Sequence, residues 1–207
     1  MDIKETLASI QSKLIEENLK HKDFTNNIDA MISNIVAMSP KKIGTFLEDI
    51  LQYHFNIEDN GNVNSENDGK KDGKNIEIKC SRVIYDNIGE HEDKYEYLIN
   101  SKKTLLSIDK LLTDKKYDCN MQQVKPGYFD EIYYTILTQE GFIVFKMTSD
   151  QVLTDKNITY SDKQHRGNTG EGQFHLKKSN IEYHINTYMI DTISWKTVIE
   201  VLKKIKV

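Results

Sequence analysis

Cysteine and proline are scarce in this chain, whose 207 residues include two of each. Cys80 and Cys119 are too few and too far apart for a disulfide framework or a zinc site, which indicates a reducing compartment. No run approaches the roughly 20 consecutive apolar residues of a membrane span, and no apolar leader opens the chain. We therefore expect a cytoplasmic protein that has no membrane partner.

An excess of basic residues is also missing. The formal net charge of −4 argues against a general binder of polyanions. Two segments are nevertheless locally basic, namely 70–82 and 163–178. A site that gathers acidic residues around a metal ion would lower the net charge without spoiling such patches, so a nucleic-acid partner remains compatible with this balance.

The length and the alternation of patterns predict one α/β domain over 1–207. Apolar residues at helical spacing predict helices over 2–19 and 28–38. Ser39 followed by Pro40 resembles the start of a helix that runs to about Phe55. A last helix is expected over 194–205.

Strand-like segments fill the middle of the chain. Strict alternation predicts a half-buried strand over 76–80, and two β-rich runs, 131–138 and 142–146, predict a second hairpin. Thr148 or Ser149 is expected to cap a short helix. The composition of 159–172 predicts a long polar loop, and 95–112 is ambiguous with a helical second half.

The segment 67–79 carries the strongest local signal, because Asp72-Gly73 suits a two-residue hairpin turn. Counting outward from that turn places Asp68 opposite Glu77, and directly opposed residues point to the same face. Lys79 shares this face because it lies two residues beyond Glu77. Two alternatives remain open: a register with Asp68-Gly69 in the turn, which would break the alternation, and a solvated surface hairpin without a function.

Two carboxylates at such a distance repel unless a cation lies between them. Mg²⁺ binds through one or two carboxylates, several waters and substrate phosphate, and it activates water for hydrolysis of phosphodiesters. Lys79 is placed to orient or deprotonate that water, or to neutralise the phosphate. Glu48 lies at the edge of the apolar face of the helix over 40–55, where an ordinary solvated glutamate is the simpler interpretation.

These residues resemble the PD-(D/E)xK nucleases, and among them the Type II restriction endonucleases. The resemblance covers 40–82 and implies that Asp68 and Glu77 are metal ligands, Lys79 the catalytic lysine and Glu48 an accessory acid. Asn67 stands where the family usually has proline. The resemblance further implies a central mixed β-sheet flanked by helices, dependence on Mg²⁺ (with Mn²⁺ as a substitute), double-stranded DNA as substrate and a homodimer. A looser resemblance concerns the segment 122–126 and the run 129–134 that follows it. Together they look like the third core strand region of several such nucleases.

A second polar stretch, 163–177, predicts the part that contacts DNA. Arginine, asparagine and glutamine pair with base edges, whereas lysines and glycine-rich backbone follow phosphates. Alternation over 173–177 places Phe174 and Leu176 opposite the polar side chains. The predicted DNA-binding residues are Lys163, His165, Arg166, Asn168, Gln173, His175 and Lys177.

The sequence therefore predicts a Type II restriction endonuclease of a restriction-modification system, with a helical part over 1–38, a catalytic core over 39–146 and a DNA-recognition loop and strand over 159–178. A PD-(D/E)xK nuclease of DNA repair or junction resolution is the first alternative. A DNA-binding or structural protein without enzymatic activity is the second.

Overall fold

The computed structural model describes residues 2–19, 25–61, 66–83, 105–113, 117–163 and 169–205. Its helices are α1 (Ile3–Leu19), α2 (Thr25–Ala37), α3 (Pro40–Phe55), the 3₁₀ turn η3 (Ile108–Lys110), α5 (Ser149–Thr154), α6 (Ile181–Tyr188) and α7 (Trp195–Leu202). Its strands are β1 (Glu58–Asp59), β2 (Gly69–Lys71), β3 (Lys74–Arg82), β4 (Asp118–Val124), β5 (Glu131–Leu137), β6 (Gly141–Thr148), β7 (Ser161–Lys163), β8 (Thr169–Lys177) and β9 (Met189–Ser194).

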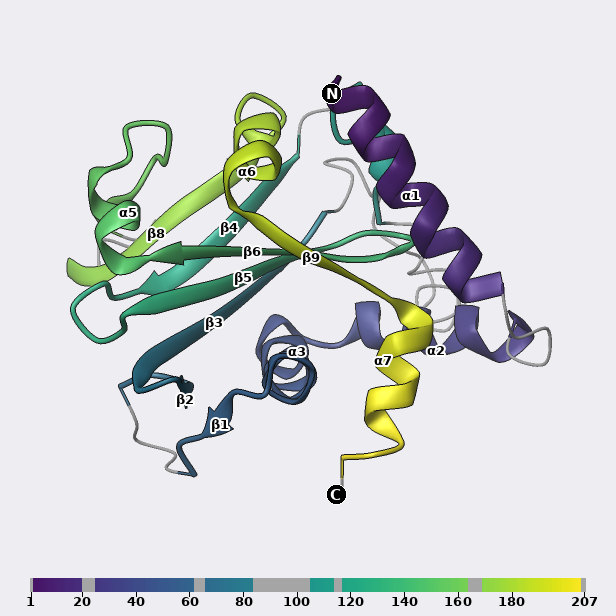
Figure 1. The fold of residues 1–207 in the computed structure, drawn as a ribbon, viewed down its shortest axis with the longest axis horizontal. Coiled ribbons are helices and arrows are strands. Elements are labelled where there is room, and N and C mark those ends of the chain that lie inside the picture. Colours follow the sequence, from purple (N-terminus) through teal and green to yellow (C-terminus); the bar gives the residue numbers. More distant parts are fainter. Residues whose placement is uncertain are drawn as a thin grey trace.

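The strands form two sheets (Figure 1). The larger has six strands in the order β1-β2-β3-β5-β6-β9, and the smaller has three in the order β4-β8-β7. Within the larger sheet β3 and β5 run parallel, whereas the other neighbours are antiparallel. The predicted fold class, an α/β fold with a central mixed sheet flanked by helices, is confirmed.

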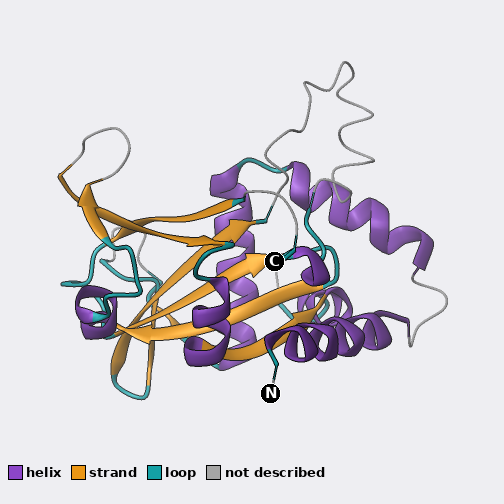
Figure 2. Ribbon diagram, turned by 90° about the horizontal axis from the view of Figure 1, so that it is seen from above, coloured by secondary structure: helices purple, strands orange, loops and turns teal. Residues whose placement is uncertain are grey.

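A separate apolar core lies on each face of the larger sheet. Helices α2, α3 and α7 pack on one face, around residues such as Leu47, Ile78 and Trp195. The smaller sheet, α1 and α6 cover the opposite face, around residues such as Leu14 and Phe174. Figure 2 shows the sheet between these layers. Strand β5 is buried along its whole length because it lies between the two cores.

The predicted hairpin is present with the predicted register. Asp72 and Gly73 form the turn with φ values of 51° and 78°, as a two-residue hairpin turn requires. Gly69 pairs with Ile76, and Lys71 pairs with Lys74. The alternative register, with Asp68-Gly69 in the turn, is wrong.

Other local predictions are also confirmed. Helix α3 begins at Pro40 and ends at Phe55, and β5 and β6 form the second hairpin. Thr148 caps α5 in a reciprocal arrangement with Gln151, each side chain bonding to the other's backbone N–H. None of the described helices is long and apolar enough to cross a membrane.

The long loop predicted over 159–172 is wrong, because β7 and the start of β8 occupy part of it. Gly172 fits in the strand since any side chain there would collide with the ring of Tyr160. The second half of 95–112 was expected to be helical. Its described residues form only the 3₁₀ turn η3, and 95–104 lie outside the described residues. Helix α6 and strand β9 were not predicted.

Candidate active site at the β2–β3 hairpin

A polar pocket of about 370 Å³ opens between the hairpin and the segment that joins β4 to β5. Three of the four residues predicted to be catalytic, Asp68, Glu77 and Lys79, line it together. The described residues that line the pocket are Glu66, Asp68, Glu77, Lys79, Gln123, Lys125 and Tyr128.

Asp68 lies just before β2, where the ladder between β2 and β3 ends. Its backbone N–H donates to the Ile76 carbonyl at 2.9 Å, and its Oδ2 accepts from the Ile78 N–H at 2.7 Å. The carboxylate thus accepts from a backbone N–H of β3 at the point where the backbone ladder with β2 has ended. One oxygen is fixed by this bond, and the other is available for a ligand in the pocket.

Glu77 and Lys79 project from β3 on the same side as Asp68. Lys79 Nζ forms an ion pair with Glu77 Oε1 and lies 3.9 Å from Asp68 Oδ2. Burial disfavours the charge on Lys79, but Glu77 and Asp68 outweigh it and raise the pKa of the ammonium. Lys79 therefore stays protonated in the folded protein.

Glu77 is a buried carboxylate whose charge is poorly compensated. Only 7% of the residue is exposed. Burial raises its pKa to about 7, and the negative charge of Asp68 acts in the same direction, whereas Lys79 and Lys125 oppose it. A buried carboxylate with a strongly raised pKa in a pocket marks a candidate functional site.

Glu48 reaches this charge cluster from α3. Burial raises its pKa to about 7, with Asp68 the next contributor. Gln52, one turn further along α3, donates through Nε2 to the backbone carbonyl of Asp68 at 2.8 Å and approaches Glu48 Oε1 at 3.4 Å. Sequence reasoning missed Gln52, although its position four residues after Glu48 puts both on one helix face.

The donor set suits a hard divalent cation. In the part of the chain that the structure describes, no group of three or more His, Cys, Asp or Glu side chains is gathered closely enough to hold a metal ion. Mg²⁺ does not need such a group, since one or two carboxylates, waters and substrate phosphate complete its shell. Asp68 and Glu77 could supply two such carboxylates, and Glu48 lies outside the lining of the pocket.

Gln123 enters the pocket from β4 and Lys125 from the segment just after that strand, about 50 residues further along the sequence. A β-bulge interrupts the pairing of β4 with β8 between Gln122 and Val124. Gln123 adopts a left-handed backbone with φ of 57°, which is costly for a residue with a side chain. Such bulges redirect side chains next to functional sites. The sequence pointed to 122–126 only as a core strand.

Tyr128 lies in a tight turn after Lys125. The N–H of Tyr128 donates to the Lys125 carbonyl at 2.9 Å. Asn67 Nδ2 donates to the Tyr128 carbonyl at 3.3 Å, which joins this turn to the residue before Asp68. The interpretation of the hairpin as a simple solvated surface feature is therefore too limited, because it forms one wall of a built pocket.

The predicted DNA-binding residues have mixed surroundings. Lys163 and Lys177 are exposed, whereas Gln173 is buried and accepts from Asn120 Nδ2 at 2.9 Å. His175 Nδ1 lies 2.6 Å from Asp118 Oδ1. His165, Arg166 and Asn168 lie outside the described residues. The predicted alternation of β8 is confirmed by its two buried apolar residues, Phe174 and Leu176.

No family model, no curated protein and no solved structure matches this chain. The resemblance to the PD-(D/E)xK nucleases therefore stays a prediction, carried by Asp68, Glu77 and Lys79. The function is inferred below from the chemistry of their shared pocket.

Proposed function

We propose that this protein is a metal-dependent endonuclease of the PD-(D/E)xK type that hydrolyses phosphodiester bonds in double-stranded DNA, and specifically a Type II restriction endonuclease. The observation that carries the proposal is the convergence of Asp68, Glu77 and Lys79 in one polar pocket. Its described lining holds three carboxylates, Glu66, Asp68 and Glu77, against two lysines, Lys79 and Lys125, and this excess of negative charge favours uptake of a further cation.

Asp68 and Glu77 would hold Mg²⁺, with Mn²⁺ as a substitute. When bound, the ion supplies Lewis acidity at the phosphate and lowers the pKa of a coordinated water. The raised pKa of Glu77 fits this assignment, because burial penalises its charge until a cation compensates it.

Lys79 acts through its positive charge. Its pKa is raised, so the amine keeps its proton and is a poor general base. In the structure the ammonium is paired with Glu77. With Glu77 engaged by a cation, Lys79 would be available to stabilise the negative charge that develops on the phosphate oxygens.

Two residues of the opposite wall can position the scissile phosphate. Lys125 brings a second positive charge close enough to lower the pKa of Glu77, so it contributes to the field across the pocket. Gln123 offers an amide that can both donate and accept, and its bulged backbone holds it in a fixed direction. Gln52 keeps the loop of Asp68 in place through the carbonyl bond.

DNA beyond the pocket would lie along the smaller sheet, which shares β4 with the pocket wall. Exposed Lys163 and Lys177 suit phosphate contacts, which fix the position of the protein on the duplex. The other predicted DNA-binding residues are His165, Arg166, Asn168, Gln173 and His175. A homodimer would place one such pocket on each strand.

The direct test is incubation of the purified protein with phage DNA in Mg²⁺. Discrete fragments are expected, and they should disappear with Asp68→Asn. Asp72→Asn is the matched control, since that carboxylate lies in the hairpin turn outside the pocket lining. Loss of cleavage in the Asp72 variant with retention in the Asp68 variant would overturn the assignment.

The same assay separates the alternatives. Preference for branched or mismatched duplexes over linear phage DNA would indicate a nuclease of repair or junction resolution. Binding without cleavage in either Mg²⁺ or Mn²⁺ would indicate a DNA-binding protein without enzymatic activity.

A further inference from the structure

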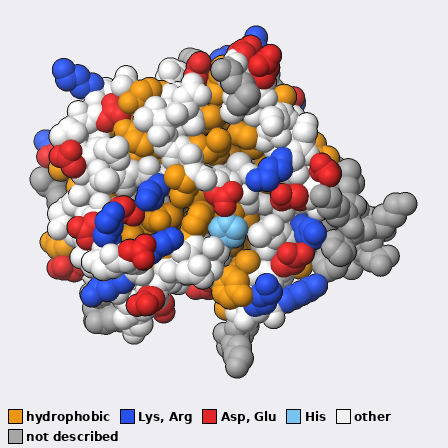
Figure 3. All heavy atoms as spheres, in the orientation of Figure 1, with side chains coloured by type: hydrophobic (Ala, Val, Ile, Leu, Met, Phe, Trp, Pro, Cys, Tyr) orange, Lys and Arg blue, Asp and Glu red, His pale blue; other side chains and the backbone are white. Residues whose placement is uncertain are grey.

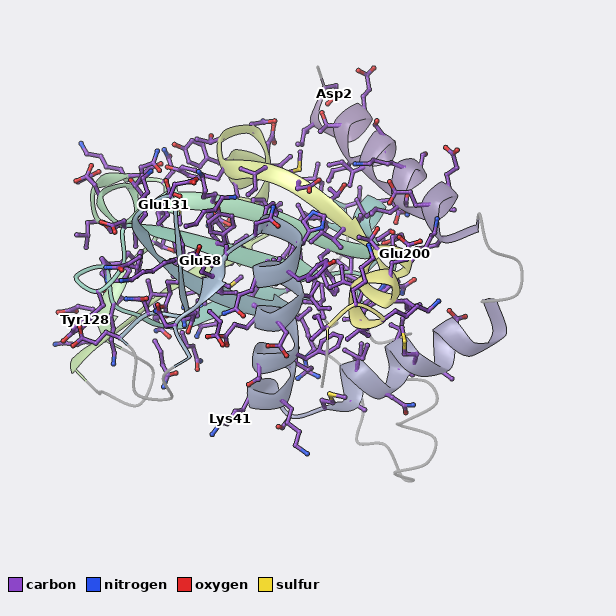
Figure 4. All side chains as sticks on the ribbon, turned by 60° about the horizontal axis from the view of Figure 1, so that its bottom comes forward. Asp2, Lys41, Glu58, Tyr128, Glu131 and Glu200 are labelled. Carbon is purple, nitrogen blue, oxygen red and sulfur yellow. The ribbon has the colours of Figure 1, made fainter. Side chains whose placement is uncertain are left out.

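Among the described residues that line the pocket, Tyr128 is the one aromatic side chain. It is 44% exposed, so a large part of a flat apolar ring faces solvent at the rim of a polar site. Figure 4 shows Tyr128 at the periphery of the molecule. The protein covers the rest of the residue, and the exposed part of the aromatic side chain offers a surface to a ligand.

The backbone that carries Tyr128 is fastened to the hairpin at two points. Asn67 Nδ2 donates to the Tyr128 carbonyl. Two residues later, Asp130 N–H donates to the Asn75 carbonyl at 2.9 Å, and Asp130 Oδ2 accepts from the Asn75 N–H at 2.8 Å. Pro126 restricts the turn further. The backbone at Tyr128 is therefore held at a set place relative to Asp68, and the exposed ring extends from this fixed point.

We propose that Tyr128 stacks on a nucleobase adjacent to the scissile phosphate, an inference that rests on the proposed nuclease function. The faces of bases inside a regular duplex are covered by their neighbours, so a ring can stack there only on an unstacked nucleotide. The substrate class is accordingly DNA in which one nucleotide beside the cut is unstacked, either beforehand or on binding. Tyr128 positions that nucleotide while Asp68, Glu77 and Lys79 face the phosphate.

Stacking depends on the aromatic ring and not on the hydroxyl group. The informative variants are therefore one that removes the ring and one that removes only the hydroxyl group. Tyr128→Ala should lower kcat/KM for cleavage of phage DNA by about tenfold, whereas Tyr128→Phe should retain wild-type cleavage. Tyr53 on α3 is the matched control, because it is also 44% exposed and lies outside the pocket lining. Tyr53→Ala should cleave as the wild type does.

A second measurement reports unstacking directly. An oligonucleotide duplex of the mapped cut sequence, with 2-aminopurine on either side of the scissile phosphate, is bound in Ca²⁺ to prevent cleavage. The fluorescence should change on binding to the wild type and to Tyr128→Phe, and much less with Tyr128→Ala.

Equal kcat/KM and equal fluorescence for Tyr128→Ala and the wild type would overturn the stacking role while leaving the nuclease function in place. A loss shared by Tyr128→Phe would also overturn it, because the hydroxyl group would then be the active part. Absence of cleavage by the wild type itself would remove the proposed function and this inference together.

Discussion

Glu77 on β3 and Glu131 on the adjacent strand β5 are equally buried, each 7% exposed, yet their surroundings are opposite. Glu131 is bound by Lys74 at one oxygen and by Lys146 at the other. Burial alone would raise its pKa, but the two lysines outweigh burial and lower it. Glu77 shares a single lysine with Asp68, and its pKa is raised.

The difference shows which buried charge is structural and which is available for a ligand. Glu131 belongs to the sheet face that carries Ile76 and Tyr133, where two cations already satisfy it. Figure 3 shows acidic and basic side chains interleaved over this view of the molecule. Glu77 points to the other face, into a pocket with too little positive charge for its carboxylates. The predictions below test this contrast.

The largest effect is expected from paired substitutions of the two glutamates. Glu77→Gln should abolish Mg²⁺-dependent cleavage, because it removes one of two proposed metal ligands. Glu131→Gln should leave cleavage close to wild type. Digestion of phage DNA and calorimetric titration with Mg²⁺ measure both. The contrast fails if Glu131→Gln is the inactive variant.

Removal of the lysine amine should have the next largest effect. Lys79→Met should lower the rate of cleavage by about 10²–10³-fold, since it deletes charge stabilisation at the phosphate. Mg²⁺ should still bind, because Asp68 and Glu77 remain. Single-turnover kinetics at saturating Mg²⁺ measure the chemical step. A normal rate with Lys79→Met would exclude Lys79 from the reaction.

Mg²⁺ binding should strengthen as the pH rises from 6 to 8. In the folded protein the pKa of Glu77 is about 7, above its ordinary value of 4.5. Protonation of Glu77 therefore stabilises the folded state in the absence of Mg²⁺, and this stabilisation is complete below pH 4.5. That stability is lost as the pH rises through 7, and Glu48 contributes in the same direction. Mg²⁺ binds the ionised carboxylates.

The measurement is the melting temperature with and without Mg²⁺ at pH 6, 7 and 8. The stabilisation by Mg²⁺ should grow with pH in the wild type and disappear in Glu77→Gln. A stabilisation that shrinks with increasing pH would contradict the assignment of Glu77.

Stability should respond in the opposite order to activity. Glu131→Gln should lower the free energy of unfolding by about 1–2 kcal/mol, because a buried acceptor of two charged hydrogen bonds is weakened. Urea denaturation of metal-free protein, with Glu77→Gln as the reference variant, measures this. Glu77→Gln should cost less, since it removes a poorly compensated charge while Asp68 still lies 3.9 Å from the Lys79 ammonium.

The smallest effect concerns the smaller sheet, whose polar residues mostly satisfy one another. Lys177→Gln should weaken DNA binding modestly and reduce the salt dependence by about one counterion. Asp118→Asn should not weaken DNA binding, because this carboxylate pairs within the sheet with His175 and, at 3.9 Å, with Lys177 itself. Fluorescence anisotropy at several salt concentrations checks both. An unchanged salt dependence for Lys177→Gln would remove it from the interface.

Local features were predictable because neighbouring residues produce them. The turn at Asp72-Gly73 needs only positive φ at two adjacent positions, and the alternation of β3 then puts Asp68, Glu77 and Lys79 together. The extension of β7 and β8 into 159–172 was missed because its glycines and polar residues look like a loop. The antiparallel pairing of β7 with β8 and the close approach of Tyr160 to Gly172 make strands there instead.

The sequence by itself determined the hairpin, its register and the three charged groups on one face, because turn chemistry and the two-residue period of a strand are local. Only the tertiary structure decided that Gln123, Lys125 and Tyr128 complete the pocket, since a bulge in a distant strand and the turn after that strand bring them there. It also decided that Glu131 is satisfied and Glu77 is not. That outcome depends on which lysines the neighbouring strands bring within reach of a buried carboxylate.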